Sequence, residues 1–418
     1  MGKTLSNDLL LAQEEGYPVA HVMQPAVRCI FTYRTGAYTY DYSFNPTLNT
    51  NRLQHVEQRE HVSEGDGGVI LLSNHDRAIP DDLTGYYVDL GWGLNTSSGI
   101  KWASADGAVS PRLWVMRQQY ITGAPLGQMP QLYVVCEMAG VWTAVLNQQP
   151  VRLGTAPYYR YNLDDPDGLE SPPGPFVISA LTDLTVYECI KYLLGGDTTP
   201  KTGLSLQTGY NFTLDALGTQ DDELINSLKP FRSGGPLLLD INNRTPAEFD
   251  TYGSLIRSLL SKTKCVIRPK PGLAFKIVYP QATDAIDETY YSSMSMGHPF
   301  YQVSQFRLSA VPNHIEIYGT DPETLLPSTS IFGEWYDINH YSGWISPTTN
   351  PTYDGAFMPV TSTKYCAGLT TAQECINQAA ALGKSYRERQ LSGRLIIPMD
   401  LRVELHDRIG IADTRGVV

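Results

Sequence analysis

The feature that most constrains the fold is an alternation of apolar and polar residues with a period of two. Tyr86, Val88 and Leu90 fall on one side of an extended chain, with polar or half-polar residues between them. A strand that buries one face has this period. Further strands with the same pattern are expected at residues 113–120 and 131–142. These strands predict an antiparallel domain built from hairpins.

Composition shifts divide the rest of the chain. Residues 161–176 are too rich in Pro, Gly and Asp for regular structure, which indicates a linker. Helical patterns then appear before strands return. The expected segments are an N-terminal antiparallel β-domain at 1–160, a linker at 161–180, a helix-on-sheet α+β domain at 181–300, and a second β-domain at 301–418.

Two amphipathic helices are predicted in the middle segment. Thr182 or Asp183 can cap a helix over residues 185–194. A second helix is expected to begin at Thr245, with Pro246 in its first position and a capping box completed by Glu248.

A hairpin follows the second helix. The turn is expected at Pro271–Gly272, with Cys265 and Ile267 opposite Phe275 and Ile277. The middle segment is therefore predicted to pack helices on a small sheet.

The last segment is expected to begin with a strand that turns Ile315 and Ile317 inward. Residues 323–366 have weak periodicity and are expected to form irregular loops. A helix is predicted near residues 372–390, capped by Thr371 and Glu374, before the final strands.

Composition argues against several functional classes. A formal charge of −12 without a long basic run does not predict a broad nucleic-acid surface. The six cysteines are spread singly, without a paired spacing typical of zinc sites or disulfide frameworks, which favours reduced, buried thiols. The N-terminal residues lack an apolar signal segment, and no window of about 20 apolar residues predicts a membrane span.

No catalytic motif is present. His55 and His61 do not form a metal-binding pattern, and the adjacent His75 and Asp76 point to opposite faces of an extended chain. The acids of residues 164–167 read as turn formers and not as a calcium loop. We therefore predict a protein that is not an enzyme, with no catalytic, cofactor-binding or metal-binding residues. A carboxylate pair brought together only by folding would leave no motif, so a glycosidase stays open.

The order of these segments resembles the central hub and tail-tip proteins of tailed bacteriophages and related contractile injection systems. The likeness spans residues 4–416 and depends on the collinear order of segments more than on any one motif. Pro312 and Asn313 lead a strand like the one by which that family returns to its tube-forming sheet, and residues 398–416 are similar to its closing strands. A recurrent family segment is matched by Asn74, Asp76, Leu83, Gly85, Val88, Leu90 and Gly93.

The resemblance implies a β-rich α+β fold, with antiparallel tube-forming β-domains and an inserted small α+β domain. It implies a structural virion protein, assembled in the host cytoplasm, that caps or nucleates the tail tube and leaves a channel for DNA. Its partners would be copies of itself in a ring, expected to be a homotrimer, tail tube and distal tail proteins, and fibre or spike proteins. DNA would be met only in transit, and no stable membrane insertion or cofactor is expected.

Aromatic residues are the candidates for contacts with neighbours, because Trp and Tyr are favoured at interface centres. Their alternative role is a local core within the loop region. A receptor-binding or carbohydrate-binding tail protein, in which these rings would stack on sugars, is the second hypothesis, and a tail-associated cell-wall hydrolase is the third. The candidates are Trp335, Tyr336, Tyr341 and Trp344.

Overall fold

The structure is a computed structural model of the 418-residue chain. It describes residues 5–14, 24–33, 35–48, 51–61, 66–96, 98–103, 110–123, 131–148, 184–194, 212–217, 223–230, 251–281, 284–293, 298–307, 311–321, 327–336, 360–366 and 369–413. The expected linker at 161–180 lies outside these ranges.

The chain forms two compact units, each assembled from separate stretches of sequence. Unit 1 contains residues 1–148, 268–303 and 394–418, and unit 2 contains residues 149–267 and 304–393. The fold is β-rich α+β, as the sequence predicted.

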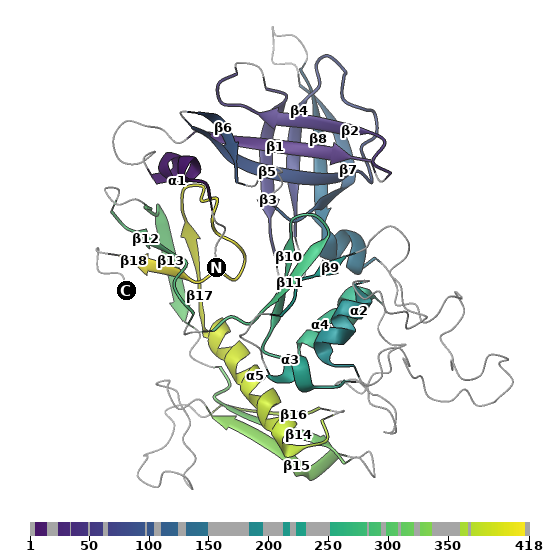
Figure 1. The fold of residues 1–418 in the computed structure, drawn as a ribbon, viewed down its shortest axis with the longest axis vertical. Helices are drawn as coiled ribbons and strands as arrows, with labels where there is room; N and C mark the ends of the chain where they lie inside the picture. The colour runs from purple at the N-terminus through teal and green to yellow at the C-terminus, as the bar shows by residue number, and fades with distance from the viewer. Residues whose placement is uncertain are drawn as a thin grey trace, which may run out of the picture. The chain divides into compact units, whose positions relative to one another are not determined.

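An eight-stranded antiparallel sheet dominates unit 1 (Figure 1). Its path runs β2-β1-β5-β7-β8-β4-β3, and β6 pairs with β5 beside that path. The strands are β1 (Pro25–Thr32), β2 (Thr39–Phe44), β3 (Leu53–Arg59), β4 (Gly67–Ser73), β5 (Tyr87–Thr96), β6 (Gly99–Trp102), β7 (Leu113–Gly123) and β8 (Gln131–Gly140). The strands expected from the period-two pattern are therefore confirmed.

The core of this sheet is made by its own strands and the segment that precedes β5. Val88 and Leu90 are fully buried, and Tyr86 is buried beside them. Ile79 and Leu83 close the same core from the loop before β5. At about 25 cal/mol for each square ångström of apolar surface removed from water, such burial is the main stabilising term.

The N-terminal helix α1 (Asn7–Glu14) packs against β5 and β6 of this sheet. Leu5 and Leu9 are buried with Leu94 of β5 and Leu401. Gln13 donates a hydrogen bond from Nε2 to Oδ1 of Asp400 at 2.8 Å. The helix therefore joins the start of the chain to a segment near its end.

A short π-helical turn, η1 (Trp142–Leu146), follows β8. The carboxylate of Asp66 accepts hydrogen bonds from the backbone N–H groups of Trp142 and Thr143. A side chain at Gly140 would collide with this carboxylate, so glycine is required there. Burial raises the pKa of Asp66, although these hydrogen bonds oppose the rise.

Four shorter strands also contribute residues to unit 1. The strands β12 (Glu288–Tyr291) and β18 (Ile409–Ala412) pair in parallel. The predicted hairpin forms from β10 (Val266–Lys270), at the boundary between the units, and β11 (Ala274–Val278), with Gly272 at a φ of 75° in the turn.

In unit 2, the first of the two predicted middle helices forms, with its cap later in the chain than expected. The first is α2 (Val186–Leu193), whose cap is Thr185, with Glu188 completing the capping box, and not Thr182 or Asp183. The next long one is α4 (Tyr252–Leu260), capped by Thr251 with Ser254. The predicted cap at Thr245 lies outside the described residues. Thr251 Oγ1 accepts the backbone N–H of Ser254, and Ser254 Oγ accepts the backbone N–H of Thr251, which makes a reciprocal cap.

A three-stranded sheet with order β15-β14-β16 lies under one long helix in unit 2 (Figure 1). The strands are β14 (His314–Thr320), β15 (Pro327–Tyr336) and β16 (Thr361–Tyr365), and the helix is α5 (Ala372–Gln390). The predicted cap of α5 by Thr371 and Glu374 is confirmed: Glu374 donates its backbone N–H to Thr371 Oγ1 at 3.2 Å.

Two of these strands, β15 and β16, lie within residues 323–366, where the sequence predicted irregular loops. That expectation is wrong for these strands. The pattern of β15 is weak because one face packs against α5 and the other carries both polar and aromatic side chains, and β16 is short and mostly exposed. The predicted inward direction of Ile315 and Ile317 in β14 is confirmed, since both are fully buried.

The remaining elements are short. Unit 2 contains β9 (Thr213–Leu214) and α3 (Glu223–Ser227). The strands β13 (Gln302–Arg307) and β17 (Leu391–Ile396) pair with each other and run across the boundary between the units.

Candidate assembly surfaces

The histidines singled out in the sequence do not form a centre. His55, His61 and His75 are exposed, and His75 contacts Ser73 through Nδ1 at 3.0 Å. Asp76 instead pairs with Arg52 at 2.5 Å. No group of metal-ligating side chains suited to a metal ion occurs among the described residues.

The cysteines are buried, as predicted. Burial raises the pKa of the Cys366 thiol to about 11 and that of Cys136 to about 12. A thiol with such a pKa supplies little thiolate for nucleophilic attack or metal binding. These side chains act as small apolar core residues.

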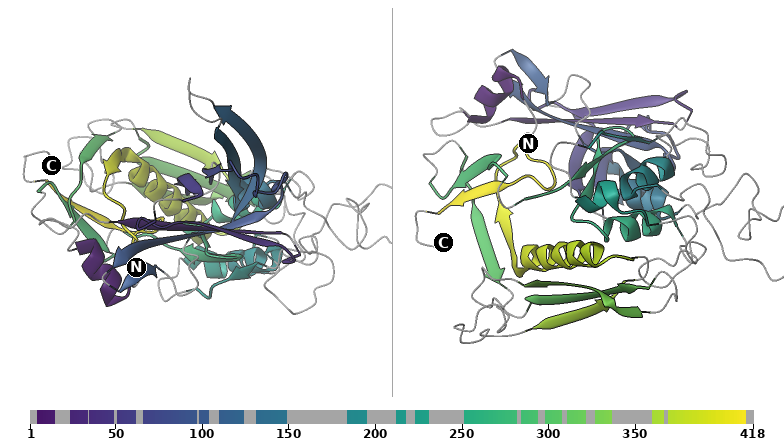
Figure 2. Two further views of the ribbon diagram at one scale, coloured as in Figure 1. Left: turned by 90° about the horizontal axis from the view of Figure 1, so that it is seen from above. Right: turned by 60° about the horizontal axis from the view of Figure 1, so that its bottom comes forward.

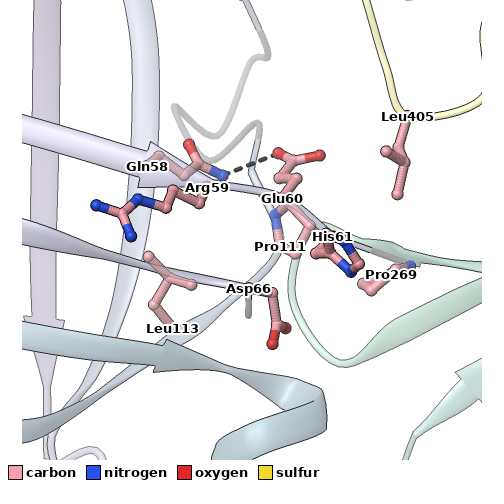
Figure 3. A pocket seen from close by; sticks show the side chains of 9 residues that line it. All are labelled: Gln58, Arg59, Glu60, His61, Asp66, Pro111, Leu113, Pro269 and Leu405. Atoms are coloured by element: carbon pink, nitrogen blue, oxygen red, sulfur yellow. Dashed lines mark hydrogen bonds between the residues drawn. The ribbon is translucent and has the colours of Figure 1, made fainter. Parts of the chain in front are cut away.

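A pocket in unit 1 lies between the end of β3 and the loop before β7 (Figure 3). Its polar side chains do not converge. Arg59 turns away to pair with Glu57 at 2.7 Å, and Glu60 accepts a hydrogen bond from Gln58 at 2.8 Å. Asp66 points toward η1, which it caps. Arg59, Glu60 and Asp66 are thus engaged in contacts with their own neighbours.

A dense polar cluster in unit 1 surrounds Arg402. Its guanidinium pairs with Asp400 at 2.9 Å and also with Glu288. Tyr290 donates its hydroxyl to Asp400 Oδ2 at 2.8 Å, and Gln13 reaches the other carboxylate oxygen. Burial alone would raise the pKa of Asp400, but the hydrogen bonds and charge of Arg402 outweigh it and lower that pKa. The cluster joins α1, β12 and the segment before β18, which is a structural role.

Two of the four aromatic candidates lie in the described residues, on opposite faces of β15. Trp335 packs against α5, where a side chain at Gly383 would collide with its ring. Tyr336 lies on the opposite face and stacks on His314, with ring centroids 4.4 Å apart. Tyr341 and Trp344 lie outside the described residues. Their role as interface residues stays a prediction.

Glycines in the sheet allow α5 to approach the strands closely. A side chain at Gly333 would collide with the backbone of α5 at Cys375 and Ile376, and one at Gly319 would approach Cys375 Sγ at 3.1 Å. We call the other side of the three strands the open face. It carries His314, Glu316, Tyr318, Thr320, Phe332, Glu334, Tyr336, Thr361, Thr363 and Tyr365.

A second surface was not predicted from the sequence. Strand β7 pairs with β5 only at Leu113 and Trp114, while its pairing with β8 continues to Gly123. Beyond Val115, no strand of the described residues pairs with this side of β7, which we call the β7 edge. In the left view of Figure 2, the dark-blue β7 and β8 curve away from the purple strands.

Apolar side chains accompany the β7 edge. Met116 is 47% exposed and Ile121 is 43% exposed, and Tyr120 is exposed to a similar extent. The nearer part of the edge is bordered by the loop before β5, where Gly85 donates its N–H to the carbonyl of Val115 at 2.8 Å. Exposed apolar residues on an unpaired strand are the only signal that could have indicated this surface.

No helix in the part of the chain that the structure describes is long and apolar enough to span a membrane.

Comparisons with known proteins give a likeness of structure. No family model matches the chain. A search of curated proteins gave no match either. The structure is similar to that of the tail protein from Neisseria meningitidis MC58, with a TM-score of 0.53 and 9% sequence identity over 94% of this chain and 88% of that one.

Two further solved structures are similar at lower scores. The 43 kDa tail protein of prophage MuSo2 from Shewanella oneidensis has a TM-score of 0.48 and 8% identity, over 94% of this chain and 90% of that one. A chain of the p2 virion baseplate in its activated conformation has a TM-score of 0.27 and 9% identity, over 94% and 92%. The chain therefore has a fold like that of the Neisseria tail protein.

Proposed function

We propose that the chain is a structural subunit of the central hub at the tip of a phage tail, and that it has no catalytic role. The proposal is carried by the β7 edge, an unpaired strand edge within a large antiparallel sheet, in a fold like that of a tail protein. Copies of the chain would form a ring, expected to be a trimer, that caps or nucleates the tail tube.

The physical reason lies in the backbone groups of β7. An exposed strand edge presents N–H and C=O groups that readily pair with another chain. Closure into a ring pairs or covers such edges and gives every copy the same contact. The exposed side chains of Met116, Tyr120 and Ile121 would then be removed from water as the backbone groups pair.

The charge of the chain suits a ring that DNA passes through. A formal charge of −12 repels phosphate, so DNA would slide through such a channel without sticking to it. DNA would be a partner only in transit. Tail tube, distal tail and fibre or spike proteins would surround the ring.

The purified chain tests this function by its solution mass and by negative-stain images. We expect a mass of three chains and rings with a central hole. Ile121→Lys places a charge on the β7 edge, and we expect it to give monomers that keep the wild-type circular dichroism spectrum. Leu11→Lys, at a helix position that is 50% exposed, is the matched control and should still form rings.

Other results would contradict the hub. A wild-type chain that stays monomeric at high concentration and binds host envelope would instead be a receptor-binding tail protein. Turnover of peptidoglycan or surface polysaccharide, abolished by a single acid substitution, would make it a hydrolase.

A further inference from the structure

Two carboxylates face each other on the open face of unit 2. In the register of β14 and β15, Glu316 lies directly opposite Glu334. Like charges at directly opposed positions of an antiparallel pair destabilise the sheet. The described residues of the open face include one histidine, His314, and neither Lys nor Arg. The face is therefore acidic.

Each carboxylate is held in place by a hydroxyl group. Tyr336 donates its hydroxyl to Glu334 Oε2 at 2.6 Å, and Thr363 donates Oγ1–H to Glu316 Oε2 at 2.7 Å. The ring nitrogen Nε2 of His314 lies 3.5 Å from Glu334 Oε2 and 3.8 Å from Glu316 Oε1. These contacts fix both acids on the sheet while leaving the Glu334 side chain 42% exposed and that of Glu316 25% exposed.

Aromatic rings border the acids on both sides along the strands. The ring of Tyr336 lies parallel to that of His314, with an interplanar angle of 4°. On the other side, Tyr318 packs on Phe332 with ring centroids 4.9 Å apart. Tyr365 is 36% exposed, and its hydroxyl lies 2.8 Å from Thr320 Oγ1. Two carboxylates thus lie between two aromatic pairs.

Among the described residues of unit 2, no helix or strand makes extensive contact with the open face. Helix α5 runs along the other side of β14, β15 and β16, and no other described helix or strand of this unit packs on the three strands (Figures 1 and 2). The exposed side chains of this face include Glu334 and Tyr365, whereas His314 is buried.

We propose that the open face docks a partner polypeptide through an arginine side chain. A guanidinium is always charged, donates hydrogen bonds in a planar fork that matches carboxylate groups, and stacks on aromatic rings. Lysine supplies the charge but not the planar fork, and a neutral sugar supplies neither. The charge of Glu316 and Glu334 and the flanking rings together favour arginine.

This docking site goes beyond the hub proposal and does not depend on ring formation. Its residues all belong to unit 2, whereas the β7 edge belongs to unit 1. A chain that forms no ring could still bind a basic partner, and a ring could form without one.

The test uses the full chain and a fluorescent tetra-arginine peptide, followed by fluorescence anisotropy. We expect saturable binding, with a tetra-lysine peptide weaker and a tetra-citrulline peptide, which has the same shape without charge, not bound. The double variant E316Q/E334Q should weaken tetra-arginine binding at least tenfold. Tyr365→Ala should weaken it about threefold, the effect expected for one exposed cation–π contact.

The matched control is E57Q/E137Q, which changes the net charge equally at two acids of the eight-stranded sheet whose side chains are 43% and 47% exposed. It should bind the peptide as the wild type does. Equal loss in both double variants would show general charge attraction and overturn the proposal. So would undiminished binding to E316Q/E334Q, or displacement of the peptide by neutral maltoheptaose, which would indicate a sugar-binding face. The single variant Glu334→Gln, at the more exposed acid, repeats the test if the double variant does not fold.

Discussion

The eight-stranded sheet of unit 1 and the three-stranded sheet of unit 2 bury their apolar side chains in different ways. The large sheet buries its inner side chains against one another and against the loop before β5. The small sheet needs α5 to cover one face and leaves the other exposed. A sheet that makes its own core exposes backbone edges, whereas a sheet covered by a helix exposes a whole face. The two surfaces therefore suit different partners: another strand for the first, and charged side chains for the second.

The largest expected effect is in the core of the large sheet. Leu90 is fully buried in β5, so Leu90→Ala leaves a cavity and should lower the free energy of unfolding by about 3 kcal/mol. Urea denaturation measures the change. A loss below about 1 kcal/mol would mean that the inner side chains of this sheet do not form a close-packed core.

A smaller loss of stability is expected when alanine replaces a glycine of the small sheet than when a core leucine is truncated, and a glycine of the large sheet serves as the control. Gly333→Ala should cost about 2 kcal/mol, because its new methyl group meets the backbone of α5, which cannot rotate away. Gly123→Ala in β7 is the matched control, since nothing lies within 4 Å of its added carbon. Equal stability of the two variants in urea would contradict the close packing of α5 on β15.

The same contrast explains how much of the fold could be predicted from sequence. Strands such as β5 and β14 bury alternate residues completely, and the period-two pattern of Val88 and Leu90, or Ile315 and Ile317, reports this directly. Strand β15 could not be predicted, because a partly aromatic open face opposite Gly333 removes the contrast between its faces, and β16 is short and mostly exposed. Such strands form because a neighbouring strand pairs with them, and a single sequence does not show which strands pair.

The candidate surfaces could likewise be predicted only in part, because some of their features depend on strand pairing. Tyr336 was identified from its residue type, but Trp335, chosen for the same reason, packs against α5. The opposition of Glu316 and Glu334 depends on the register of two strands and leaves no local motif. The β7 edge likewise depends on where β5 stops pairing. The start of α5 at Thr371 was predicted correctly, whereas the start of α2 was not, although Thr185 and Glu188 form the same kind of capping box.

The cap of α5 should contribute about 1 kcal/mol. Thr371→Ala removes the oxygen that accepts the backbone N–H of Glu374, so the free energy of unfolding should fall by that amount. Thr371→Ser keeps the oxygen and should restore most of the stability. If both variants are equally stable in urea, the hydroxyl does not cap the helix.

A pH effect is expected from unit 1. Burial, and then the charge of Arg268, lower the pKa of His406. The unfolded chain therefore takes up a proton before the folded one as the pH falls below about 6.5, and stability falls with it. His406→Asn removes the titration and suits the left-handed backbone, where φ is 70°.

Melting temperatures between pH 7.5 and 5.5 check this assignment. The wild type should lose more of its melting temperature over this range than His406→Asn. Parallel curves for the two proteins would assign the acid sensitivity to other groups.

The smallest effect on stability is expected on the open face. Glu334→Gln removes one of two directly opposed charges at a position that is 42% exposed, so the free energy of unfolding should change by less than about 0.5 kcal/mol. Urea denaturation should therefore show a stable protein that binds the arginine peptide more weakly. A loss above about 2 kcal/mol would make the acid a structural element of the small sheet, and not a docking group.

The most direct test of a hub subunit is a density map of the assembled virion that contains this chain. We expect copies of the chain in a ring at the tail tip, around the channel, with the β7 edge of each copy against its neighbour and the open face of unit 2 against a basic side chain of a surrounding protein. Density for the chain on a peripheral fibre, or a ring whose contacts leave β7 exposed to solvent, would contradict the account.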